Sequence, residues 1–258
     1  MDSSAALSER ESRDRELFDR IASTYAKKDL KPAHRIARKL RLTQTLKVAD
    51  FGPAPRVMEI GCGAGFAARY MEGRYGAFVG IDYSEKLISY AREFNRNERA
   101  TFEVVNINDY EPPEQFDVVF MIGLLHHLDD PAETLTKVLK HLRPGGWVVA
   151  NEPQSGNPLV SWLRQMRKKV DKNYSDEQLE YARGDLRAIF EKAGLTDIKI
   201  VPQGILSTPF AEVSMPAQPL MAPISYICCA LDRVLESALS PILYSVAWNL
   251  VAAGRRPA

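Results

Sequence analysis

The sequence predicts an α/β fold with a mostly parallel sheet that is covered by helices on both faces. Short apolar runs of strand length alternate along the chain with segments whose apolar residues recur at helical spacing. The runs are apolar almost throughout, which is typical of parallel strands buried on both faces. A glycine-rich turn directly after the first run fits the same architecture.

Seven apolar runs have the length and composition of strands. Five of them follow one another closely, and two more lie in the last third of the chain. The predicted strands cover 56–60, 78–82, 101–105, 116–121, 147–151, 197–201 and 248–253.

Helices are predicted at the N-terminus and between the strands. About twelve residues at the start look disordered, and apolar residues from Leu17 to Tyr25 then recur at the spacing of one short amphipathic helix. Asp130 fits as the N-cap of a later helix, with Pro131 at the first helical position. Further helices are predicted over 33–47, 162–169 and 185–193.

Length and composition indicate a single globular domain over 1–258. Hydrophobic residues make up 45% of the 258 residues and charged residues 26%, and no repeat or low-complexity linker divides the chain. The net charge of +1 gives no reason to expect a nucleic-acid partner. Cys62, Cys228 and Cys229 are too few and too poorly spaced for a disulfide framework or a zinc site, so a reducing cytoplasm fits best. The polar N-terminus lacks the apolar segment of a secretory signal.

Two uncharged stretches near the C-terminus, 213–231 and 237–254, approach the length that spans a bilayer. Prolines interrupt both, so we expect short packed elements rather than a transmembrane hairpin. We expect residues 205–245 to wall a cleft together with the N-terminal helix. Contact of this apolar segment with a lipid surface is left open.

The strongest functional motif is VMEIGCGAGF at 57–66. Gly61, Gly63 and Gly65 follow a strand and lead into a helix, as is needed where a turn is tight and a ligand approaches the backbone. The next predicted strand ends at Asp82, whose carboxylate can accept both ribose hydroxyls of a nucleoside. Together these features predict nucleoside binding; the simpler alternative is a tight turn with a capping Asp.

The glycine spacing bears on which nucleoside is bound. A dinucleotide fingerprint has the pattern G-x-G-x-x-G, whereas this chain has G-x-G-x-G and places Phe66 where the third glycine would fall. An NAD-dependent oxidoreductase is therefore the second hypothesis. A non-catalytic protein that binds a membrane surface or a partner is the third.

At these residues the chain resembles the class I S-adenosylmethionine-dependent methyltransferases, in their small-molecule and quinone-type branch. The likeness covers EIGCGAG, DYSEKLI, FDVVFMIGLLHHL and LRPGGWVVANEP, from Phe18 to Glu152. It implies a Rossmann-like sheet of seven strands with the last antiparallel. It also implies N-terminal helices over 1–50 that form part of a cap, a cofactor-binding core over 51–153, and a C-terminal part over 154–258 with a helical cap insert.

The resemblance also implies the reaction. An acceptor oxygen or carbon, rather than a nitrogen, would attack the sulfonium methyl group of S-adenosylmethionine directly, and S-adenosylhomocysteine would leave; no metal is needed. The apolar C-terminal segment suggests a hydrophobic acceptor such as a prenylated quinone, a polyketide or a lipid-linked species.

Cofactor-binding residues are carried over from the family position by position. Glu59 would lie below the methionine end and help to fix the glycine loop, Asp82 would hold the ribose, and Tyr83 would lie against the adenine. Asn106 replaces the usual acidic residue after the third strand, but its side-chain carbonyl oxygen can still accept a hydrogen bond from the adenine amino group. The full set is Tyr25, Glu59, Gly61, Cys62, Gly63, Gly65, Asp82, Tyr83, Asn106, Ile107, Met121, Ile122 and Gly123.

Three residues are candidates for proton transfer. His126 or His127 could act as a general base, since a neutral imidazole accepts a proton near pH 7. The alternative is that one of them is a buried structural histidine. Glu152 would face the same cleft and could take the same role, or cap the turn that follows it.

Two basic clusters, within 27–47 and 162–169, are the last feature. Each cluster is interpreted either as a solvent-exposed helix face or as a surface that attracts an anionic substrate or lipid headgroups. No aromatic platform accompanies them, so RNA is disfavoured. The sequence does not indicate an oligomeric state.

Overall fold

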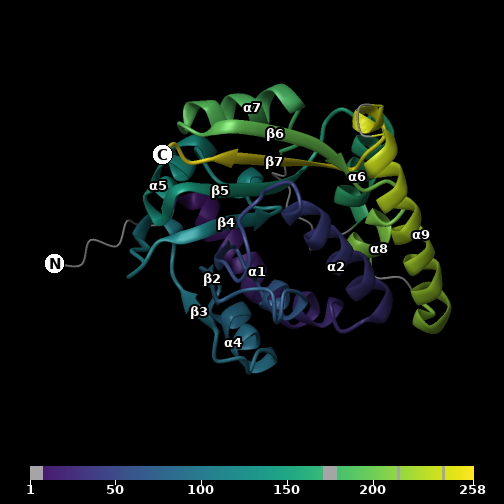
Figure 1. Cartoon of the computed structure of the whole chain (residues 1–258). Coiled ribbons are helices and arrows are strands. Elements are labelled where there is room, and N and C mark those ends of the chain that lie inside the picture. The colour runs from purple at the N-terminus through teal and green to yellow at the C-terminus, as the bar shows by residue number, and fades with distance from the viewer. Residues whose placement is uncertain (1–7, 171–178, 214–215, 240–241) are drawn as a thin grey trace.

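A computed structural model describes residues 8–170, 179–213, 216–239 and 242–258. A single seven-stranded sheet lies between layers of helices (Figure 1). Its strand order is β3-β2-β1-β4-β5-β7-β6, and only β7 runs antiparallel to its neighbours. This is the predicted fold, and the predicted direction of the last strand is also confirmed.

Every predicted strand is present, with its limits shifted by a few residues at most ends. The strand β5 is extended most, because it starts at Leu142, before the glycines at 145 and 146, and stays paired with β7 as far as Pro153. The strands are β1 (Arg56–Ile60), β2 (Ala77–Asp82), β3 (Ala100–Val104), β4 (Phe116–Ile122), β5 (Leu142–Pro153), β6 (Thr196–Gln203) and β7 (Asn249–Arg255).

The helices of the described residues include three short 3-10 turns, η1 to η3. The helices are α1 (Glu9–Lys28), α2 (Pro32–Leu46), α3 (Phe66–Tyr70), α4 (Glu85–Phe94), α5 (Pro131–His141), α6 (Pro158–Val170), α7 (Arg183–Lys192), α8 (Thr208–Glu212) and α9 (Gln218–Leu239), with η1 (Ile107–Asp109), η2 (Leu125–His127) and η3 (Leu243–Ser245).

The first helix corrects the prediction of a disordered start. Residues 1–7 lie outside the described residues, but α1 already begins at Glu9 and has 20 residues. A capping box fixes this end, because Ser8 accepts from the Glu11 amide and the Glu11 side chain accepts from the Ser8 amide. The apolar residues indicate only the later turns of this helix, and the capping box shows that it begins about two turns earlier.

The core explains why the strands read as continuous apolar runs. Alternate residues of β4 enter different clusters: Val119 and Met121 pack on one face of the sheet, and Val118 and Phe120 on the other. All four are at most 1% exposed. Both faces of the central strands are therefore buried, and the loops at their carboxyl ends are held by a rigid sheet.

The helix α9 corrects the prediction that prolines divide the C-terminal apolar segment. It is a continuous helix of 22 residues that contains Pro223. It packs beside α2 (Figure 1), where Cys229 and Met221 contact Ala33 and Ala37. Pro223 lies in the second turn, where a proline removes one backbone hydrogen bond without ending the helix. Among the described helices, none has both the length and the hydropathy required to cross a bilayer.

Candidate active site

The glycine-rich turn joins β1 to α3 at the carboxyl end of the sheet. Its first two amide groups, those of Gly61 and Cys62, donate to the Ile81 carbonyl of β2 over 2.9 and 3.0 Å. The Gly63 amide donates to the Asp82 carboxylate over 2.9 Å. Hydrogen bonds to the neighbouring strand therefore hold this glycine loop open against the sheet edge.

The three glycines of the loop have positive φ angles, of 70°, 51° and 69°, but they serve different purposes. A Cβ atom on Gly61 or Gly63 would point toward the site, where it would meet Leu124 at 3.0 Å or Tyr25 at 3.4 Å. A Cβ atom on Gly65 would instead meet Phe102 at 2.7 Å. Gly61 and Gly63 thus leave room beside the ligand space, and Gly65 allows close packing against β3.

Asp82 lies at the tip of β2, as predicted. One carboxylate oxygen accepts from Gly63 and the other accepts from the Ser84 amide over 2.9 Å. Burial raises the pKa of Asp82 to about 6. The carboxylate is therefore oriented by backbone donors and is costly to ionise in the absence of a ligand.

Two small cavities lie on either side of the glycine loop. The first has a volume of about 80 Å³, and its lining includes Asp82, Tyr83, Asn106, Ile107 and His127. The second, of about 90 Å³, is lined by residues that include Glu59, Cys62, Arg38 and Arg41. Gly61, Gly63, Ile122 and Tyr25 line both cavities. Because the resemblance assigns the adenosine to the residues of the first, we call these the adenosine-side cavity and the α2-side cavity.

The helix α1 covers both cavities. Phe18 packs edge-on against both Tyr25 and His127, with ring centroids 5.9 and 5.7 Å apart. The Tyr25 ring lies above Gly63, and Arg38 donates to its hydroxyl over 3.4 Å. Phe18, about two helical turns before Tyr25, therefore covers the site together with it.

Glu152 is fully buried and its carboxylate organises the turn after β4. One oxygen accepts from the Leu124 and Leu125 amides, both over 2.9 Å, and the other lies 2.7 Å from Nδ1 of His126. Burial lowers the pKa of His126. This geometry is that of a structural pair that fixes the η2 turn, and neither residue lines either cavity.

His127 has a different environment. Its Nδ1 lies 2.8 Å from the Asp14 carboxylate of α1, and its ring lines the adenosine-side cavity. Of the three candidates for proton transfer, His127 is the one that faces the space where a ligand can bind.

Most of the other predicted site residues border the cavities, with two exceptions. Gly65 is turned toward β3, and Met121 is 1% exposed and packs in the core on the opposite side of its strand from Ile122. The Asn106 oxygen already accepts from the Asn108 amide over 3.0 Å, as the cap of η1. Gly123, which has a φ of 66°, completes the adenosine-side cavity.

Glu59 lies at the floor of the α2-side cavity. Burial and the nearby Asp82 and Asp29 carboxylates raise the pKa of Glu59 well above its usual range. Its Oε2 atom is buried and has no hydrogen-bond partner within the described part of the chain. Such an atom is costly unless a ligand satisfies it, so Glu59 indicates that a donor group binds here.

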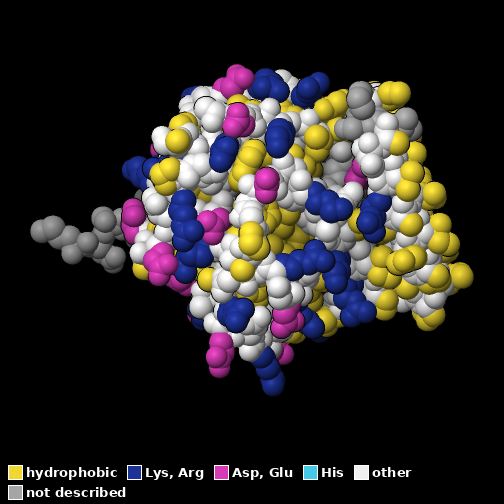
Figure 2. Space-filling model, in the orientation of Figure 1, with side chains coloured by type: hydrophobic (Ala, Val, Ile, Leu, Met, Phe, Trp, Pro, Cys, Tyr) yellow, Lys and Arg dark blue, Asp and Glu magenta, His cyan; other side chains and the backbone are white. Residues whose placement is uncertain are grey.

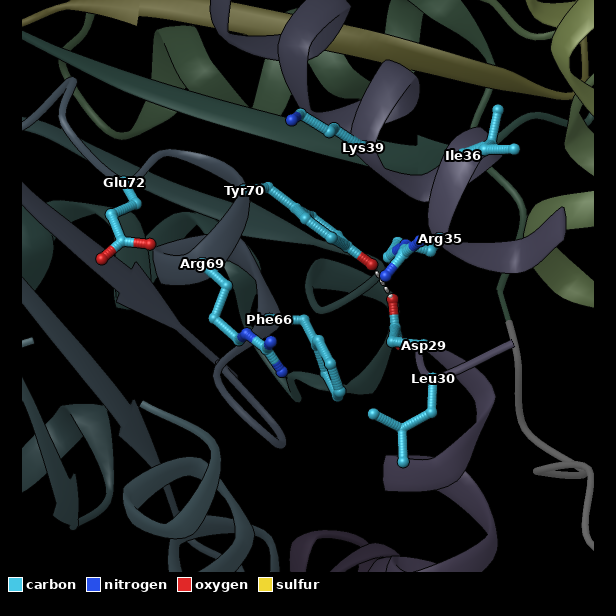
Figure 3. Close-up of a pocket in the computed structure, with 9 residues that line it drawn as sticks. All are labelled: Asp29, Leu30, Arg35, Ile36, Lys39, Phe66, Arg69, Tyr70 and Glu72. Atoms are coloured by element: carbon cyan, nitrogen blue, oxygen red, sulfur yellow. Dashed lines mark hydrogen bonds between the residues drawn. The ribbon is translucent and has the colours of Figure 1, made fainter. Parts of the chain in front are cut away.

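Sequence reasoning did not identify the two arginines of the α2-side cavity, because it treated all basic residues of 27–47 alike. Arg38 forms an ion pair with Asp29, which also accepts from the Tyr70 hydroxyl over 2.7 Å (Figure 3). Arg41 donates to the Asn151 side-chain oxygen over 2.7 and 3.2 Å. The regular helical spacing of α2 would have marked them, since both point to the side that faces the sheet edge.

The remaining basic residues of these clusters take other positions. Arg35, Lys39 and Arg69 surround an outer pocket of about 420 Å³ that adjoins the α2-side cavity (Figure 3). In α6, Arg164 is 5% exposed and pairs with Glu180, so it does not belong to a solvated face. The side chains of 167–170 lie outside the described residues.

The described part of the segment 205–245 does not wall the cleft as predicted. None of its described residues lines either cavity. The helix α2 stands between α9 and the glycine loop, and it takes the place that the prediction gave to the C-terminal segment. The described residues also contain no group of three or more His, Cys, Asp or Glu side chains arranged to hold a metal ion.

Comparisons with known proteins agree with this geometry. A family profile described as a methyltransferase domain matches residues 58–148. The ubiquinone biosynthesis O-methyltransferase of Neisseria meningitidis is 30% identical over 208 residues, which cover 75% of this chain and 87% of that protein. The enzyme of the same name from Thiobacillus denitrificans is 35% identical over 124 residues, 46% of this chain, and the chain spans only 53% of that relative.

Solved structures share the fold. Phosphoethanolamine N-methyltransferase 2 of Haemonchus contortus, in complex with S-adenosyl-L-methionine, superposes with a TM-score of 0.65 at 19% identity, over 98% of this chain and 61% of that one. Magnesium protoporphyrin IX methyltransferase of Synechocystis superposes with a TM-score of 0.60 at 11% identity, over 96% and 100% of the two chains.

The glycine loop, the carboxylate at the tip of β2 and the unsatisfied Glu59 fit the nucleoside and amino-acid ends of S-adenosylmethionine, and the Neisseria enzyme shares most of its length with this chain. The predicted resemblance is confirmed, and nothing in the comparisons supports the oxidoreductase or the non-catalytic alternative. The chain belongs to the class I S-adenosylmethionine-dependent methyltransferases.

Proposed function

We propose that this protein methylates a hydroxyl oxygen of a small, apolar acceptor with S-adenosylmethionine as the methyl donor. The observation that carries the proposal is a ligand space bordered by the oriented Asp82 carboxylate, an unsatisfied Glu59 and a His127 ring. The curated relatives, which are named for O-methylation in ubiquinone biosynthesis, favour oxygen and an apolar ring as the acceptor.

In this proposal, each of the two cavities holds a different part of the methyl donor. Asp82 would accept the ribose hydroxyls, with Tyr83, Asn106 and Ile107 around the adenine. Glu59 would accept from the amino group of the methionine end, which satisfies its buried oxygen. When bound, S-adenosylmethionine supplies an electrophilic methyl group and leaves as neutral S-adenosylhomocysteine.

Arg41 is suited to the carboxylate of the methionine end. The guanidinium lines the α2-side cavity and bonds to the neutral side-chain oxygen of Asn151. Among the described carboxylates, none lies within ion-pair distance of it, and burial lowers the pKa of Arg41. An anionic ligand group would compensate for the burial of this cation.

The protein's own part in catalysis is orientation, exclusion of water and proton transfer. Phe18 and Tyr25 cover the space from above, so that the acceptor and the donor meet away from solvent. His127 is the candidate base for the acceptor hydroxyl. Glu152 and His126 remain weaker candidates, because their hydrogen bonds hold the η2 turn.

Two measurements test the proposal. Isothermal titration should detect binding of S-adenosylhomocysteine and no binding of NAD. A long-chain alkylcatechol incubated with isotope-labelled donor should gain one methyl group, and unsubstituted catechol, which presents the same hydroxyls without the chain, should react at least about tenfold more slowly. Donor binding without transfer to either catechol would refute the acceptor class, and failure to bind the donor would refute the activity.

We further propose peripheral contact with an anionic membrane through the outward face of α9. Five aliphatic residues form a stripe along it, Leu220, Ile224, Ile227, Leu231 and Val234, and they are 38–65% exposed. Figure 2 shows this apolar surface at the α9 edge of the molecule, almost without acidic side chains. The two carboxylates of the helix turn inward, since Asp232 accepts from the amides of 205–207 and Glu236 from that of Gly204. An apolar face that exposes Arg233 and no carboxylate suits an anionic lipid surface.

Vesicle flotation tests this contact. The protein should float with phosphatidylglycerol-containing vesicles at low salt and much less so at high salt. Val234→Asp should abolish flotation, and Val104→Asp, the same change at an exposed valine of β3 away from α9, should not. Light scattering is the second measurement, because a stable dimer that Val234→Asp dissociates would assign the stripe to a second copy and refute the lipid contact.

A further inference from the structure

Asp14 and His127 are joined across 113 residues of sequence. Asp14 lies in the second turn of α1 and is 7% exposed, and its Oδ2 atom lies 2.8 Å from Nδ1 of His127. Asp14 therefore belongs to the helix that covers the site, and His127 to the turn that follows β4. Arg10 of α1 also holds this turn, because it donates to the His126 and Leu128 carbonyls on either side of His127.

The hydrogen bond determines which nitrogen of His127 faces the ligand space. A carboxylate accepts only, so Nδ1 must carry the proton, and Nε2 is left with its lone pair. Nε2 makes no hydrogen bond within the described part of the chain, and the ring lines the adenosine-side cavity with Gly61 and Gly123. His126 has the same pairing with Glu152, but its Nε2 is buried and does not line a cavity.

We propose that Asp14 is a positioning residue that acts through His127, and that α1 assembles the pair when it covers the site. This inference rests on the proposed O-methylation. The acceptor hydroxyl gives its proton to Nε2, and the resulting imidazolium is stabilised by the Asp14 carboxylate. The proton then passes to water when the site opens.

The position of α1 couples this pair to ligand binding. The helix is also held by the Ser84 hydroxyl, which donates to Asp19 over 2.5 Å next to Asp82. Beneath it the cavities measure only about 80 and 90 Å³, whereas ligand sites usually enclose ~300 Å³ or more. The helix must shift to admit a nucleoside, and the carboxylate reaches His127 only when it returns.

The tautomer of His127 tests the pairing without any acceptor. Long-range ¹⁵N NMR of the full chain should place the proton of neutral His127 on Nδ1. In Asp14→Ala the proton should move to Nε2, the tautomer that a histidine side chain prefers in water. Asp19→Ala, which also removes a carboxylate and one contact from α1, should leave the His127 tautomer unchanged. An Nδ1-protonated ring in a folded Asp14→Ala variant would overturn the inference.

Turnover provides the second readout, with the long-chain alkylcatechol as the probe. Asp14→Asn keeps an oxygen that can accept from Nδ1 but loses the charge that stabilises the imidazolium, so kcat should fall at least about tenfold with little change in KM. Asp14→Glu should recover part of kcat. Wild-type kcat in Asp14→Asn would overturn the inference even if the alanine variant failed to fold. Normal titration of S-adenosylhomocysteine in each variant separates this failure from failure of the proposed function.

Discussion

At the scale of single residues, Asp82 links protonation to donor binding. Burial raises its pKa to about 6, and only the ionised carboxylate can accept both ribose hydroxyls. The affinity for S-adenosylhomocysteine should therefore be constant above that pKa and fall as the pH drops through about 6, by up to about tenfold per pH unit. Isothermal titration between about pH 8 and pH 5 measures this. Asp82→Asn should bind weakly throughout, and an equally steep decline in that variant would assign the titration to another group.

Replacing Glu59 should stabilise the folded protein and weaken donor binding. Folding raises the pKa of Glu59, so above the usual pKa of a glutamate the carboxyl is ionised in the unfolded chain but still protonated in the folded one. The folded state therefore loses stability as the pH rises through this range. Glu59→Gln should therefore raise Tm, by about 2–4 °C per kcal/mol gained, and more at pH 8 than at pH 5. The same variant should weaken binding of S-adenosylhomocysteine. A variant that binds normally would show that the methionine amino group does not contact Glu59.

At the scale of elements, the glycine loop depends on close packing as well as on backbone conformation. Gly65→Ala adds a Cβ atom 2.7 Å from Phe102 and 2.8 Å from Asn95, at a φ of 69°. We expect a loss of about 2–4 kcal/mol in the free energy of unfolding, from strain and overpacking together. Gly73→Ala is the matched control, because its φ is 79° but no atom lies within 4 Å of the added Cβ, and it should lose only about 1 kcal/mol. Urea unfolding measures both, and equal losses would contradict the packing role of Gly65.

At the scale of the whole molecule, α1 should respond to the donor as a unit. The helix is held across the carboxyl edge of the sheet by Asp14, Asp19 and Arg10 (Figure 1). Binding beneath it should add contacts to Phe18 and Tyr25, so hydrogen exchange along α1 should slow when S-adenosylhomocysteine is bound. Exchange in α7, on a remote part of the sheet, should stay the same. Unchanged exchange in α1 at saturating ligand would mean that this helix does not close over the site.

The seven strands, their limits to within a few residues, and the glycine loop with Asp82 at the next strand tip could all be predicted from the sequence. These features are encoded locally: buried parallel strands require continuous apolar runs, and a tight turn at positive φ requires glycine. Which charged residues of the two N-terminal helices enter the site is visible only in the tertiary structure. Asp14 and Arg41 lie on helices rich in charged residues, and although helical spacing groups Arg41 with Arg38, it does not say which face of α1 or α2 will lie over the strand ends. Their burial follows from how α1 and α2 pack across the strand ends, and that packing depends on contacts between residues more than 100 positions apart.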